Sequence, residues 1–140
     1  MKAIAFILFI VALVGVAPCP AASQPSQSFD KCSQQFKGRT YRVAPGLIGG
    51  LSTKSALPDA ADMDPSQDFN VKVKVLIDET GLVRCAAGIE GNSELYERCV
   101  RTARQLRFQS YTLNGEPVAL ESAIYFHFSR GRVEVNFPAK

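Results

Sequence analysis

The chain has 140 residues, of which 46% are hydrophobic and 21% charged, and its formal net charge is +3. This length suits one domain with a single hydrophobic core, and the apolar content excludes a globally disordered chain. The small net charge and the absence of a run of like charges give no indication of a nucleic-acid surface or an anionic membrane surface.

The first 23 residues have the layout of a secretory signal. One basic residue, Lys2, precedes an apolar stretch from Ala3 to Ala17, and small residues follow it. As a helix, this stretch would reach about 22 Å, which is short of the roughly 30 Å hydrocarbon layer of a membrane. We therefore expect a signal peptide over residues 1–23, cleaved after Ala22 or Ser23, with a retained membrane anchor as the alternative.

Export determines the redox state that we expect for the cysteines. Cys19 lies in the signal, and Cys32, Cys85 and Cys99 reach an oxidising compartment in which disulfides persist. Since three is an odd number, at least one of these thiols stays free or pairs outside the chain.

Residues 24–55 are predicted to be a polar linker or N-terminal extension, because they begin with the turn-prone QPSQS and end in a Gly-rich loop. The domain is expected over residues 56–137.

A β-hairpin is the clearest local signal in this domain. Apolar residues alternate with Asn and Lys from Phe69 to Ile77, which is typical of a half-buried strand. The sequence DETG at 78–81 predicts a tight turn, and a second strand returns through Val83, Cys85, Ala87 and Ile89.

An amphipathic helix is predicted next, with Ser93 as its N-cap and an apolar stripe from Leu95 to Leu106. Its arginines are interpreted as a solvated helix face. A third strand then alternates between core and solvent over residues 122–129, and Val133 to Phe137 either extends it or folds back at Arg130 and Gly131.

This order of elements predicts an α+β fold, a three-stranded antiparallel sheet covered on one face by the helix. With the third strand beside the first, the strand order is second, first, third, so the third strand is an edge. An exposed edge is a template for another extended peptide. The candidate peptide-binding residues are Ser122, Ala123, Ile124, Tyr125, Phe126, His127 and Phe128, of which Tyr125 and His127 point away from the core.

Ordered features from Leu57 to Val135 carry a resemblance to a known family. The sequence reads LPDAAD, then VKVKVLIDETGLV, then a helix ending in RQLRF, then NGEPV and AIYFHF. In this order it resembles the C-terminal domain of TonB-type energy transducers, although Leu106 stands where the family usually has Trp. The resemblance implies the same three strands and covering helix.

The resemblance also implies a disulfide, since a variant of the family has one Cys in the second strand and another in the helix, similar to Cys85 and Cys99 here. The residues agree with this pairing. Cys85 is predicted on the strand face that carries Val83 and Ala87, and Cys99 lies in the helix stripe that covers that face. The alternative is two buried free thiols, and Cys32 is left as the odd thiol.

As to function, the resemblance implies a periplasmic module that captures an extended peptide of an outer-membrane TonB-dependent receptor by strand addition. Inner-membrane motor proteins become partners if the N-terminal segment is retained as an anchor facing the periplasm. The alternative is a structural or assembly protein whose edge strand is capped by its own tail, Val133 to Phe137. We expect no enzymatic activity, cofactor or metal, because no catalytic set assembles around the lone His127.

Overall fold

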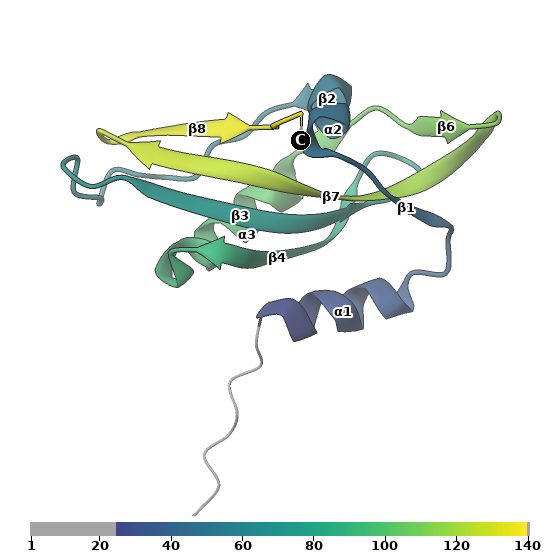
Figure 1. Cartoon of the computed structure of the whole chain (residues 1–140), viewed down its shortest axis with the longest axis horizontal. Helices are drawn as coiled ribbons and strands as arrows, with labels where there is room; N and C mark the ends of the chain where they lie inside the picture. The colour runs from purple at the N-terminus through teal and green to yellow at the C-terminus, as the bar shows by residue number, and fades with distance from the viewer. Residues whose placement is uncertain (1–24, 140) are drawn as a thin grey trace, which may run out of the picture.

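The structure is a computed structural model that describes residues 25–139, so the predicted signal peptide lies outside the described residues. The fold is α+β, as predicted, with a curled and mostly antiparallel sheet and a few helices (Figure 1). Among the described helices, none has the length and hydropathy needed to cross a membrane.

Helices and strands alternate irregularly along the chain. The helices are α1 (Pro25–Gln35), α2 (Pro45–Leu51), the 3-10 turn η1 (Ser93–Leu95) and α3 (Tyr96–Gln105). The strands are β1 (Thr40–Arg42), β2 (Ser52–Lys54), β3 (Phe69–Ile77), β4 (Val83–Gly91), β5 (Arg107–Phe108), β6 (Tyr111–Leu113), β7 (Glu116–Ser129) and β8 (Arg132–Asn136).

The three predicted strands are β3, β4 and β7, and they lie in the predicted order β4–β3–β7 with antiparallel pairing. The prediction of a sheet with only three strands is wrong. β7 has 14 residues, whereas β3 has nine, and three further strands pair with β7. β6 pairs with residues 116–118, β1 runs parallel to residues 119–121, and β8 runs antiparallel to residues 125–129.

α3 covers one face of the sheet, as its apolar stripe predicts. Alternate residues of β3 and β7 meet Leu95, Cys99, Ala103 and Leu106 in one buried core. The helix packs closely at Gly88, where an added Cβ would lie 2.3 Å from the ring of Tyr96. The N-cap is Asn92, not Ser93, because the Asn92 side chain accepts a hydrogen bond from the Glu94 N–H at 3.0 Å.

Residues 25–54, predicted to be a polar linker or N-terminal extension, are part of the fold. They form α1, β1, α2 and β2, and each helix buries one large side chain. Phe29 is 2% exposed and Ile48 is fully buried. The burial of these two residues could not be predicted from the sequence, because single apolar residues in a polar sequence give no periodic pattern.

Candidate functional site

The sheet face opposite α3, which we call the open face, carries polar and aromatic side chains from three neighbouring strands. The registers align Asn70 with His127 and Lys72 with Tyr125, and then Tyr125 with Asn136 and His127 with Glu134. Alternation places these residues on one face and Val71, Val73, Phe126 and Phe128 in the core beneath.

Contacts among these side chains fix the centre of the open face. His127 Nδ1 lies 2.7 Å from Asn70 Oδ1, within hydrogen-bond distance. Lys72 Nζ lies 5.4 Å from the centre of the Tyr125 ring and 3.5 Å from Glu90 Oε2. The neighbouring Tyr125 side chain raises the pKa of Lys72, so this residue stays cationic. The face is therefore a preorganised polar surface.

A shallow hollow of about 620 Å³ opens on this face beside the end of β8. Its walls include Tyr125, His127 and Asn136, and Phe137 and Pro138 close it where the chain leaves β8. Aromatic and polar side chains thus line a surface of a kind that can receive a side chain of a bound segment.

The predicted peptide-binding residues, 122–128, all lie in β7. Ala123, Tyr125 and His127 are on the open face, and Ser122, Ile124, Phe126 and Phe128 are on the core face. One side of this strand pairs with β3 throughout. On the other side, β8 pairs with residues 125–129, and the Ser122 hydroxyl donates to the Val43 carbonyl oxygen at 2.9 Å.

β7 is therefore not the edge that the sequence predicts. The tail folds back on it through a two-residue turn at Arg130 and Gly131, whose φ angles are 53° and 71°. Positive φ at both positions is the geometry of a tight hairpin turn. Folding back was one of the two fates expected for residues 133–137, and the signal for it was the Arg130–Gly131 pair.

Beside residues 125–129 of β7, the outer strand is β8. Ala119 N–H donates to the Arg39 carbonyl and Val43 N–H donates to the Glu121 carbonyl, so the odd-numbered residues of β7 direct their backbone groups toward β1 and β8. By the alternation of an antiparallel ladder, Arg132, Glu134 and Asn136 bond to β7, and Val133 and Val135 direct theirs away from it. In the part of the chain that the structure describes, no strand pairs with that outer side.

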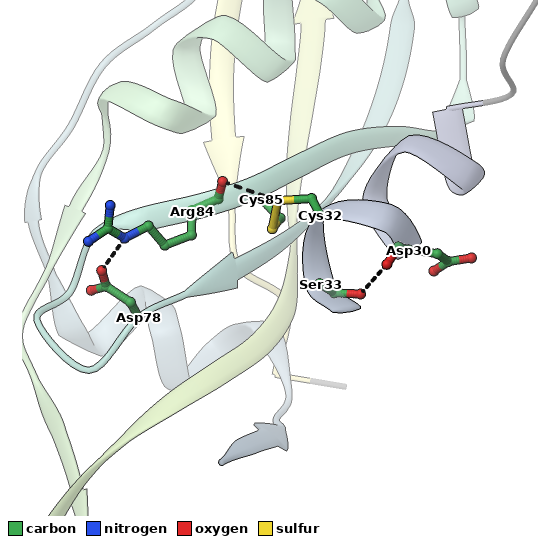
Figure 2. The surroundings of a disulfide bond; sticks show 6 residues. All are labelled: Asp30, Cys32, Ser33, Asp78, Arg84 and Cys85. Atoms are coloured by element: carbon green, nitrogen blue, oxygen red, sulfur yellow. Dashed lines mark hydrogen bonds and ion pairs between the residues drawn. A yellow bond between two sulfur atoms is a disulfide. The ribbon is translucent and has the colours of Figure 1, made fainter. Parts of the chain in front are cut away.

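The opposite outer strand, β4, is flanked instead. α1 lies beside β4 (Figure 1). On the sheet face opposite α3, Phe29 packs with Leu76, Cys85 and Ala87 in a second, smaller apolar cluster. A disulfide between Cys32 of α1 and Cys85 of β4 fixes the helix there (Figure 2). β4 is thus packed against a helix, and β8 has no described strand on its outer side.

The disulfide corrects the predicted Cys85–Cys99 pairing. Ile77 pairs with Val83 and Leu76 with Cys85, so Arg84 is an extra residue in β4. This β-bulge turns Cys85 to the face opposite α3, although Val83 two positions earlier faces the core. Cys32, expected to be the odd thiol, is its partner, with a Cα–Cα distance of 5.9 Å.

Cys99 remains a free thiol in the core under α3. Burial raises the pKa of this thiol to about 12, so it stays protonated and unreactive at neutral pH.

No protein-family model, curated protein or solved structure matches the chain. Within residues 25–139, no group of three His, Cys, Asp or Glu side chains is placed to hold a metal ion.

Proposed function

We propose that this protein is an exported, TonB C-terminal-like binding module that takes up an extended peptide of an outer-membrane transporter by strand addition. The edge that receives the peptide is that of β8, in place of the β7 residues 122–128. The observation that carries the proposal is that the Val133 and Val135 backbone groups point away from β7, to the side of β8 on which the structure describes no strand.

The surroundings of this edge suit a peptide. Val133 and Val135 are half-buried on the core side of β8 and can extend the apolar layer under an added strand. On the other side, the hollow beside Asn136 and Pro138 can receive one of its side chains. Main-chain hydrogen bonds would supply affinity, and these two surfaces would select the sequence.

Export is supported by the signal-like N-terminal sequence and by the Cys32–Cys85 bridge, because disulfides of this kind persist in oxidising compartments. A periplasmic location follows from the same proposal. If the N-terminal segment is retained, the protein is anchored in the inner membrane and motor proteins become partners. Mass determination of the mature N-terminus distinguishes the two forms.

Strand addition is tested by titrating the isotope-labelled protein with synthetic peptides from the N-terminal periplasmic segments of outer-membrane transporters. We expect chemical-shift changes and slower amide exchange at Val133 and Val135. Val133→Pro should abolish binding, because it removes an N–H that points away from β7. The fold should be kept, because a proline ring is tolerated at this position of an edge strand. Val133→Ala is the matched control, since it trims the side chain and keeps the amide.

Two results contradict the proposal. One is that no peptide of the panel binds at millimolar concentration, and the other is that Val133→Pro binds as well as Val133→Ala. A proline at Ile124 is a poorer test, since the amide of this residue faces β3 inside the sheet.

A second candidate function is favoured by the pairing of β8 with β7 itself. In this alternative the tail is a built-in cap on β7, and the protein is a structural or assembly protein without peptide capture. Gly131→Val would then loosen the hairpin, because a β-branched residue is strained at a φ of 71°. Faster exchange at Tyr125 and His127 together with aggregation of this variant, and no peptide binding by the wild type, would support the cap.

A further inference from the structure

The sequence of β8, RVEVN, gives its two faces different chemistry. Arg132, Glu134 and Asn136 share the open face, and they are exposed. Val133 and Val135 lie on the core side and are half-buried. A strand that pairs with the outer side of β8 therefore needs apolar residues on one face and, on the other, an acid opposite Arg132 and a base opposite Glu134.

β8 itself meets these requirements. We propose that β8 pairs with β8 of a second copy of this chain, antiparallel about a two-fold axis at Val133. In this register Arg132 of each copy lies opposite Glu134 of the other, and the two Val133 residues exchange backbone hydrogen bonds. The proposal goes beyond the peptide-binding function and does not depend on it, although both use the same edge.

The register follows from backbone direction and charge. Only the odd-numbered residues of β8 direct their N–H and C=O groups outward. An odd-numbered residue of one copy must therefore lie opposite an odd-numbered residue of the other copy. An axis at Glu134 satisfies the backbone equally but places Glu134 against Glu134, and like charges directly opposite destabilise a sheet. An axis at Val135 places Arg132 opposite Pro138. The axis at Val133 is the one that pairs unlike charges twice.

The two-fold symmetry of this pairing limits the β8–β8 contact to two copies. Isologous pairing about a two-fold axis closes, whereas pairing of β8 with β4 would propagate into a filament. The arrangement also removes the edge as an aggregation hazard.

The dimer is expected to be weak. β8 has five residues, and a pair of such strands buries less than the roughly 1,200 Å² typical of stable interfaces. Association should therefore depend on concentration and on salt, since the two ion pairs are exposed.

Charge reversal tests the proposal by sedimentation velocity over a concentration series of the disulfide-bonded protein. Arg132→Glu and Glu134→Arg should each weaken dimerisation by about tenfold, because two cross-strand pairs become repulsive. The double variant, Arg132→Glu with Glu134→Arg, should restore it. Lys31→Glu is the control, since it makes the same charge change as Arg132→Glu on the exposed side of α1.

Three results would overturn the inference: a monomer at every concentration, a double variant that stays as weak as the single ones, or a stronger dimer from Glu134→Gln, which would indicate an axis at Glu134. The peptide titration is run at a concentration where the protein is monomeric. If the protein binds peptide but stays monomeric at every concentration of the sedimentation series, this inference alone is defeated. If it forms the dimer but binds no peptide, the proposed function alone is defeated.

Discussion

The ammonium nitrogen of Lys74 lies 4.5 Å from the centre of the Phe29 ring, so a strand of the central sheet holds a residue of the N-terminal helix by a cation–π contact. Phe29 is 2% exposed and is the one fully buried side chain of α1. The docking of this helix therefore depends on one aromatic anchor and one disulfide.

Phe29→Ala should undock α1 without unfolding the sheet. Loss of a buried Phe costs about 3 kcal/mol, and this cost falls on the small cluster around Leu76 and Ala87. Hydrogen exchange should accelerate in α1 and along the outer side of β4 while β3 stays protected. Phe36→Ala removes a partly buried neighbour and is the control. Equal loss of protection in β3 would show that α1 belongs to the main core.

Peptide mapping of the unreduced protein by mass spectrometry should recover a Cys32–Cys85 cross-linked fragment. Cys32→Ser should lower the free energy of unfolding by about 4 kcal/mol in the chain-entropy model, because the bridge closes a loop with a sequence separation of 53. Cys99→Ala keeps the bridge and loses only a buried thiol, so its fragment map should be unchanged. A Cys85–Cys99 fragment would contradict the structure.

Asp78 gives the β3–β4 turn a pH-dependent stability. Burial raises the pKa of this carboxyl, but hydrogen bonds from the Thr80 hydroxyl, the Leu82 and Thr80 amides and Arg84 outweigh it and hold the pKa below the usual value. The carboxylate therefore stabilises the fold above the unfolded-state pKa of about 3.9, and this stability is lost as the pH falls through the lower folded-state pKa.

Chemical unfolding measured between about pH 6 and pH 2 should show this loss as a falling free energy of unfolding. Asp78→Asn should be less stable near neutral pH by about 2 kcal/mol and should depend less on pH. Asp68→Asn removes a carboxylate outside this turn and serves as the control. An unchanged pH profile in Asp78→Asn would show that other carboxylates are responsible.

Gly88 and Tyr96 should behave as a coupled pair. Gly88→Ala forces a Cβ into the Tyr96 ring and should destabilise the protein by about 2 kcal/mol. In the background of Tyr96→Ala, the same change should cost much less, because the ring that it meets is gone. Gly50→Ala is the control at a glycine where an added Cβ meets nothing. Additive costs would mean that the close contact is not the cause.

The sequence by itself determined the hairpin of β3 and β4, the covering helix α3 and the two faces of β7. β3, α3 and β7 carry long periodic patterns, and burial of one face fixes which of their residues point inward. The same patterns placed Tyr125 and His127 on the open face, where the structure has them.

The cysteine pairing and the strands that lie beside β7 depend on tertiary structure alone. One extra residue at Arg84 reverses the face of Cys85, and no periodicity in the sequence marks that bulge. Short segments such as β1 and β8 have too few residues for a pattern, and their place beside β7 is set by what the longer strands leave unpaired. Local periodicity fixes which way a side chain points, but which strand lies at an edge depends on contacts between residues far apart in the chain.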